Sequence, residues 1–224
     1  MERLWRHPAF PYVAPFALFL LLLSLQDYLL FLEAWQAPLR FAALGAVLLL
    51  VSRRVVDLRM ASPAATVALG LVVFALWIAP DLLWPGYRQH WLFDNRLLGS
   101  AANPHNRILS ESGMFIVFRL LRAVVIVPVV EELFWRGWLM RWLVHPDFQS
   151  VPLGAYTRRS FWWTAILFAM EHGSYWEVGL IAGVAYNWWM IRTRRLGDCI
   201  LAHAVTNAAL SAYVVLYGQW QYWP

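Results

Sequence analysis

The sequence contains no lysine, and only 14% of its 224 residues are charged. A soluble domain usually has about a quarter of its residues charged, so this scarcity argues against a soluble globular chain. Cys199 is the sole cysteine, which excludes an internal disulfide and a metal cluster built from cysteines. The basic residues are not interleaved with aromatic residues in the manner that reads bases, so we expect no nucleic acid as a partner.

Apolar residues dominate the amino-acid composition of the chain. They make up 61% of the chain, and the mean hydropathy is +0.53. Several apolar runs approach the roughly 20 residues that a helix needs to cross a bilayer. Many of the 15 tryptophans stand near the ends of these runs, where the headgroup region favours them. We predict an all-α, polytopic membrane helical bundle of seven to eight transmembrane helices. The seven clearest runs are 11–32, 38–52, 63–84, 114–143, 159–173, 176–191 and 197–217.

The sequence shows no linker, charge run or internal repeat that would divide it, so we expect a single membrane-embedded domain over residues 1–224. The first run lacks a cleavage site of small residues and is not interpreted as a signal peptide. Residues 85–112 are rich in glycine, proline and polar residues, which predicts a loop.

All 18 basic residues are arginines. If the N-terminus is cytoplasmic, twelve of them fall in inner segments and four in outer segments, as the positive-inside rule requires. We therefore expect a cytoplasmic N-terminus. The basic pI of about 9.7 then indicates contact with anionic membrane lipids.

Two adjacent carboxylates, Glu131 and Glu132, close an apolar run where charge is costly. Glu132 and Arg136 are spaced for an ion pair on one helix face. Glu131 lies about 100° around the helix, which makes it the candidate general base. Pro128 lacks an N–H, so the Val124 carbonyl is expected to lose its helical donor. The alternative interpretation is a solvated ion-pair cluster at the end of the fourth span.

Histidines follow in two later runs. His172 ends one of them, and a single histidine there is often a satisfied core or interfacial residue. His203 and Asn207 are four residues apart, so both lie on one helix face among small apolar residues. They could bond a neighbouring helix, or both could direct donors into a shared cavity.

Together these segments resemble the three motifs of the CPBP family of intramembrane proteases, which includes CAAX prenyl endopeptidases and relatives tied to bacteriocin immunity. The resemblance covers roughly residues 110–217. The residues around 129–136 and 201–207 also resemble the branch found alongside exosortase and PEP-CTERM sorting systems. The motif residues are Glu131, Glu132 and Arg136, then Phe168 and His172, then His203 and Asn207.

The resemblance implies an intramembrane endopeptidase whose catalytic core, residues 111–217, follows N-terminal spans and an outer loop at 1–110. Glu131 and His172 would activate water in a conical polar cavity, while His203 and Asn207 stabilise the oxyanion. Glu132, Arg136 and Phe168 would support them. The expected substrate is a peptide or a lipidated C-terminus in a bacterial inner membrane, with an exosortase system as partner. From helix lengths we expect this cavity toward the cytoplasmic half.

Three alternatives remain at this point. An older view of such enzymes makes Glu131, His172 and His203 zinc ligands, which is acceptable chemistry. The chain lacks His-Glu-x-x-His, and the metal-free mechanism, with no cofactor, is favoured. A non-catalytic scaffold or immunity protein is the second alternative. A proton-coupled transporter is disfavoured, because the sequence has no repeated halves.

Overall fold

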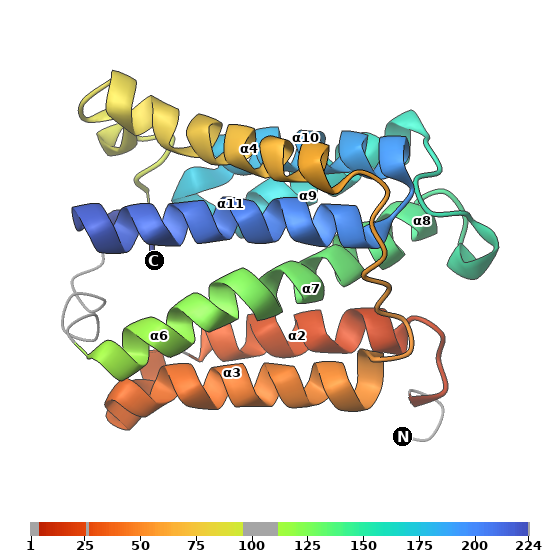
Figure 1. The fold of residues 1–224 in the computed structure, drawn as a ribbon, viewed down its shortest axis with the longest axis horizontal. Coiled ribbons are helices and arrows are strands. Elements are labelled where there is room, and N and C mark those ends of the chain that lie inside the picture. Colours follow the sequence, from red (N-terminus) through yellow and green to blue (C-terminus); the bar gives the residue numbers. More distant parts are fainter. Residues whose placement is uncertain (1–4, 26, 96–111, 224) are drawn as a thin grey trace.

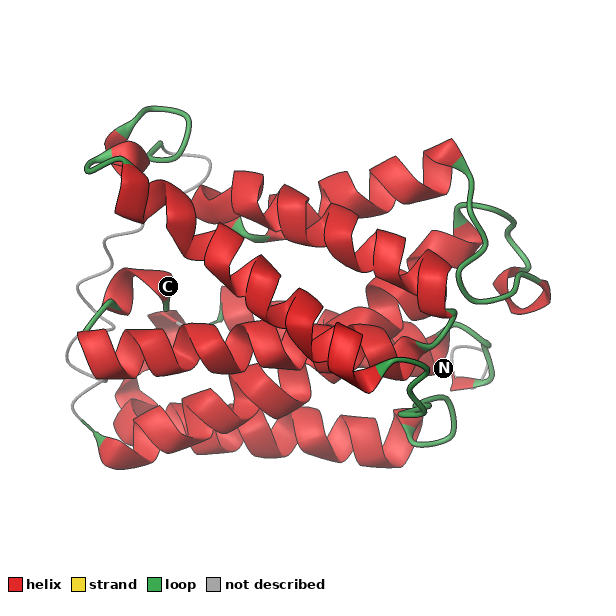
Figure 2. Ribbon diagram, turned by 45° about the horizontal axis from the view of Figure 1, so that its top comes forward, coloured by secondary structure: helices red, strands yellow, loops and turns green. Residues whose placement is uncertain are grey.

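The computed structural model describes residues 5–25, 27–95 and 112–223. Every regular element in these ranges is a helix, so the predicted all-α class is confirmed (Figure 2). The main helical segments are α2 (Phe10–Ser24), α3 with its π-helical end (Gln36–Ser52), α4 (Pro63–Leu83), the continuous helix α6–α8 (Gly113–Trp142), α9 (Arg158–Glu171), α10 (Trp176–Thr193) and α11 (Leu196–Tyr217). Short 3₁₀ turns are η1 (Asp27–Trp35), η3 (Tyr87–Gln89), η6 (Phe148–Ser150), η7 (Gly173–Tyr175) and η8 (Trp220–Tyr222).

Three of these helices are long and apolar enough to cross a membrane, namely α4, α6–α8 and α11. The other predicted runs also form helices, but they are shorter or more polar, so seven spans stay a prediction. The first run, expected at 11–32, ends as an α-helix at Ser24, and η1 follows it. Residues 96–111 of the predicted loop lie outside the described ranges.

Helix α11 occupies the middle of the bundle (Figure 1). It packs on α4 at one side and on the middle of α6–α8 at the other, while α10 contacts both α11 and α4. Helices α2 and α3 cover the opposite side of α6–α8. Of the motif-bearing helices, α6–α8 and α11 therefore lie between α4 on one side and α2 and α3 on the other, whereas α9 packs mainly on α10.

The contact between α4 and α11 depends on a buried aspartate. Asp198, in the first turn of α11, accepts hydrogen bonds from the backbone N–H groups of Ala61 and Ser62 at 2.7 and 3.2 Å. It also accepts one from the Thr66 hydroxyl at 2.7 Å. The Ser62 side chain makes no capping bond of its own, so a residue of another helix satisfies the free N–H groups where α4 begins.

Two glycines of α10, Gly179 and Gly183, let α9 and α10 approach closely. A Cβ atom on Gly183 would stand 3.1 Å from the Ala165 carbonyl oxygen, and one on Gly179 would stand 3.2 Å from His172 Cβ. These positions leave little room for a side chain. The close packing therefore fixes the end of α9, where His172 lies.

The helix that carries the glutamate pair is irregular. It consists of α6 (Gly113–Leu121), a π-helical turn η4 (Arg122–Ile126), α7 (Val127–Glu132), a second π-helical turn η5 (Leu133–Leu139) and α8 (Met140–Trp142). Each π-helical turn adds a residue to the helical repeat, and such turns often occur at functional sites. Here they flank the two glutamates on both sides.

Candidate active site

A cavity of about 410 Å³ lies among α2, α4, α7, α9, α10 and α11. Its wall brings together residues from all three sequence motifs. The motif residues on this wall are Glu131, Phe168, His172, His203 and Asn207. Glu132 and Arg136 are fully buried and stand behind the wall. The bundle thus gathers five of the predicted site residues at one cavity and places the remaining two in its support.

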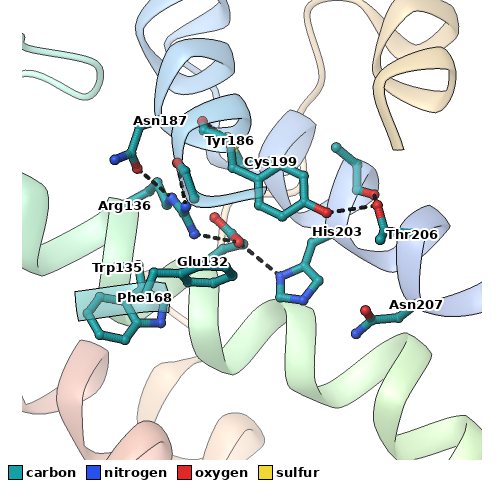
Figure 3. A network of polar contacts seen from close by, with 12 residues as sticks. Glu132, Trp135, Arg136, Phe168, Tyr186, Asn187, Cys199, His203, Thr206 and Asn207 are labelled. Atoms are coloured by element: carbon teal, nitrogen blue, oxygen red, sulfur yellow. Dashed lines mark hydrogen bonds and ion pairs between the residues drawn. The ribbon is translucent and has the colours of Figure 1, made fainter. Parts of the chain in front are cut away.

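Glu132 and Arg136 form the ion pair that their spacing predicted. The Arg136 Nη1 atom lies 3.0 Å from Glu132 Oε1, and both side chains are fully buried (Figure 3). The remaining nitrogens of Arg136 are also used, because Nε donates to Asn187 Oδ1 at 2.9 Å and Nη2 to the Gly183 carbonyl at 3.2 Å. The guanidinium group is therefore saturated by partners on its own helix and on α10.

Asn187 of α10 is a supporting residue that the three sequence motifs do not include. Its Nδ2 donates to the Phe161 carbonyl at 2.8 Å while its oxygen accepts from Arg136. It thereby joins α9, α10 and η5. Its only signal in the sequence was an amide within an apolar run, which does not identify its partner.

His203 bonds Glu132, the second glutamate of the pair. Its Nδ1 atom lies 3.0 Å from Glu132 Oε1 (Figure 3). Glu132 is paired with Arg136 and accepts as a carboxylate, so Nδ1 carries the hydrogen. The ring also stacks on Tyr186, with centroids 5.4 Å apart, and the Tyr186 hydroxyl donates to Thr206. His203 is therefore fixed on two sides, and Nε2 is left for the cavity.

His172 is held by its own helix. Its Nδ1 atom lies 2.7 Å from the Phe168 carbonyl oxygen. A carbonyl can only accept, so Nδ1 carries the hydrogen and Nε2 is the nitrogen left for the cavity. The Trp77 ring of α4 meets the imidazole edge-on at 5.2 Å between centroids.

Asn207 donates from Nδ2 to the Ala123 carbonyl at 2.8 Å. This carbonyl lies in η4, where the Val127 N–H bonds the Arg122 carbonyl, five residues earlier. In that register the next donor would be residue 128, which is a proline without an N–H. Pro128 therefore leaves the Ala123 carbonyl without its helical donor. The expected carbonyl was that of Val124, because a regular α-helix was assumed.

Glu131 is only 4% exposed, and its buried Oε2 atom has no hydrogen-bond partner among the described residues. A second carboxylate, Glu171, lines the same cavity. The Trp135 indole N–H donates to Glu171 Oε2 at 3.2 Å. The sequence motifs did not single out Glu171, because it precedes the motif histidine and stands outside the motif pattern.

The far wall of the cavity lies toward the bundle end that carries η7 and η8. Tyr175, Leu210, Tyr222 and Trp223 form this part of the wall. The segments between α3 and α4, between α8 and α9 and between α10 and α11, which hold many of the arginines, lie at the opposite end (Figure 1). The cavity therefore extends past Glu131 and His203 along α11, toward the end opposite these segments. Its expected position toward the cytoplasmic half stays a prediction, because the orientation of the bundle is itself a prediction.

The zinc alternative requires Glu131, His172 and His203 to converge on one ion. Within the described residues, no group of three or more histidine, cysteine, aspartate or glutamate side chains is placed to hold a metal. His203 Nδ1 bonds Glu132 and His172 Nδ1 bonds the Phe168 carbonyl, so each ring has only Nε2 left for an ion. The three side chains are not placed around a common ion position, and no step below is derived through zinc.

Comparison with known protein families gives a match to the segment that holds this site. Residues 113–209 match the family described as type II CAAX prenyl endopeptidase Rce1-like. No curated protein and no solved structure matches the chain. The matched segment begins at α6 and ends within α11, so it includes all seven motif residues. Residues 113–209 of this chain are therefore similar to the Rce1-like family of CAAX prenyl endopeptidases.

Proposed function

We propose that the chain is an intramembrane endopeptidase in which water, activated by Glu131 and His172, hydrolyses a peptide bond. One observation carries the proposal. Glu131, His172, His203 and Asn207 come from three different helical segments, yet all four line one cavity. Peptide binding by a scaffold would not require these four side chains to line one cavity.

Water would be held between the carboxylate of Glu131 and Nε2 of His172. The His172 Nδ1 hydrogen is engaged with the Phe168 carbonyl, so Nε2 presents a lone pair that accepts from water. Glu131 takes the second hydrogen as the water oxygen attacks the scissile carbonyl. The unpartnered Oε2 of Glu131 supports this role, because its hydrogen-bonding capacity is not used by the protein.

His203 and Asn207 would stabilise the oxyanion. His203 Nδ1–H points to Glu132, so its Nε2 donates only when the ring is an imidazolium. The Glu132 carboxylate offsets that charge. Asn207 gives one amide hydrogen to Ala123 and retains the other for the cavity. Each oxyanion donor typically contributes about 3–4 kcal/mol to transition-state stabilisation.

The substrate we propose is a membrane-associated peptide or a lipidated C-terminus. Aromatic and aliphatic side chains on the cavity wall, among them Phe19, Leu23 and Trp77, suit an apolar chain beside the scissile bond. Contact with anionic lipids, a bacterial inner membrane, a cytoplasmic N-terminus and an exosortase partner stay predictions from the sequence.

Cleavage by purified protein in liposomes tests the proposal. The probes are two quenched-fluorescence peptides that end in the same tetrapeptide, one carrying a farnesylated cysteine and the other the free thiol. Wild type should cleave at least one of them, and Glu131→Gln should cleave neither. Preference for the farnesylated peptide would support a lipidated substrate.

The matched control is Asp147→Asn, which removes an exposed carboxylate far from the cavity. It should cleave like wild type. Failure of wild type on both peptides, or full activity of Glu131→Gln, would contradict the proposed function and favour the scaffold alternative.

A further inference from the structure

Glu171 is a second, partly buried carboxylate of the cavity, to which the mechanism above gives no role. Its Oε1 atom is buried without a hydrogen-bond partner among the described residues, as is Glu131 Oε2. Both residues line the cavity. Two unsatisfied carboxylate oxygens at one cavity require an explanation, because burying such a group without a partner is costly.

The fold brings these two carboxylates to the same side. Trp135 lies four residues after Glu131, so it follows one turn later on the same helix. Its indole N–H bonds Glu171 Oε2 at 3.2 Å and thereby ties the end of α9 to the helix of Glu131.

Among the described residues, the permanent cation beside this site is Arg136 of η5. It is engaged by Glu132, by Asn187 and by the Gly183 carbonyl, so it is not free to neutralise both acids. The other titratable groups on the cavity wall are two histidines and three tyrosines, namely His172, His203, Tyr175, Tyr186 and Tyr222, while the wall residues from α2 and α4 are apolar or indole side chains. Two like charges in a desolvated space cannot both ionise readily, so such a pair retains one proton.

We propose that Glu131 and Glu171 share one proton, and that Glu171 is the catalytic acid that protonates the departing amine. This inference rests on the proposed function and adds a residue that the three sequence motifs do not contain. The Trp135 bond stabilises the negative charge that Glu171 acquires when it gives up its proton.

Each carboxyl group returns to its starting protonation state after one turnover. Glu131, ionised, takes a proton from water while the water oxygen bonds to the carbonyl carbon. The tetrahedral intermediate then collapses, the carbon–nitrogen bond breaks, and the Glu171 proton moves to the nitrogen. Glu131 is left protonated and Glu171 ionised. Transfer of that proton from Glu131 to Glu171 restores the starting state, with no other reactant.

Infrared titration of purified protein tests the shared proton without requiring activity. Wild type should show one protonated carboxyl group at pH values where exposed carboxylates are ionised. This band should disappear in both Glu131→Gln and Glu171→Gln, because removing either acid relieves the repulsion. Asp147→Asn, which removes an exposed carboxylate, should keep it. A band that persists unchanged in Glu171→Gln would overturn the proposal.

Cleavage assays test the catalytic role. Glu171→Gln retains an oxygen for the Trp135 bond, so a loss of rate reports the missing proton. We expect kcat to fall by about 10²- to 10⁴-fold with KM unchanged, and the pH profile to lose its high-pH decline. Trp135→Phe, which keeps both acids, should retain the infrared band and reduce kcat less.

The two proposals fail in different ways. If Glu131→Gln abolishes cleavage but Glu171→Gln has a wild-type kcat and pH profile, the role of Glu171 is refuted and the endopeptidase assignment stands. If wild type cleaves neither peptide, the endopeptidase assignment fails, and the catalytic role of Glu171 fails with it. The infrared band then decides only whether the proton is shared.

Discussion

His203 bonds Glu132 at 3.0 Å through Nδ1, and the same Oε1 atom accepts from Arg136. The two adjacent glutamates therefore have different environments. Glu132 is a buried counterion shared by an arginine and a histidine. Glu131 keeps a buried oxygen without a partner and faces the cavity.

This difference predicts opposite effects for the two glutamine substitutions. Glu132→Gln leaves Arg136 buried without its counterion, so the free energy of unfolding should fall by about 3–5 kcal/mol. Glu131→Gln removes a carboxylate that has no partner for Oε2, so stability should stay the same or rise. Denaturant unfolding in detergent micelles measures both.

Asp57→Asn is a suitable control for these measurements. It breaks an ion pair with Arg195 in which both side chains are about half exposed, and it should change the unfolding free energy by less than about 1 kcal/mol. Equal destabilisation by Glu131→Gln and Glu132→Gln would contradict the division of roles.

Cleavage assays should distinguish Glu131→Gln from a variant of the buried ion pair, Arg136→Lys. Glu131→Gln should lower kcat by about 10²- to 10⁴-fold in a folded protein, because the general base is gone. Arg136→Lys keeps the charge but cannot reproduce three directed bonds to Glu132, Asn187 and Gly183. It should lose stability first and lose activity in proportion to unfolding. Activity normalised to the folded fraction distinguishes the two outcomes.

Asn207 and Pro128 should be coupled through the Ala123 carbonyl. Asn207→Ala leaves that carbonyl without its donor, which should cost about 1–3 kcal/mol of stability. Adding Pro128→Ala supplies a helical N–H and should recover the loss. It should not recover cleavage, because the second amide hydrogen of Asn207 would still be missing from the cavity.

A double-mutant cycle on unfolding free energies measures this coupling. If Pro128→Ala stabilises wild type and Asn207→Ala equally, the two residues do not share the carbonyl. Recovery of cleavage along with stability would instead show that Asn207 has only a structural role.

Metal removal should leave the protein unchanged. The described residues hold no group placed to bind a metal, so exhaustive chelation should alter neither cleavage nor unfolding. Metal content is measured on the same sample. Loss of cleavage that added zinc restores would revive Glu131, His172 and His203 as ligands.

The helices and the ion pair could be predicted from sequence because both follow from local spacing. Apolar runs of sufficient length gave each main helix, and four-residue spacing gave the Glu132–Arg136 pair. The same reasoning placed His203 and Asn207 on one helix face. These predictions do not depend on which helices are neighbours in the fold.

The remaining features depend on packing between distant segments. The bond from Asn207 to Ala123 requires a π-helical turn, which no local sequence pattern predicts. Asn187 acquires its role only because α9, α10 and η5 meet around it. Glu171 joins the cavity because Trp135 of another helix bonds it. In each case the residue type was visible, but its partner was not.

The bond between Asp198 and the start of α4 has a consequence for biosynthesis. Thr66 and Asp198 are 132 residues apart in the chain, so α4 is translated long before its partner is made. The amides of Ala61 and Ser62, just before α4, have no Asp198 to accept from them until α11 is made. That last helix also carries His203 and Asn207. A nascent chain therefore lacks two of the residues of the proposed site until α11 has been made.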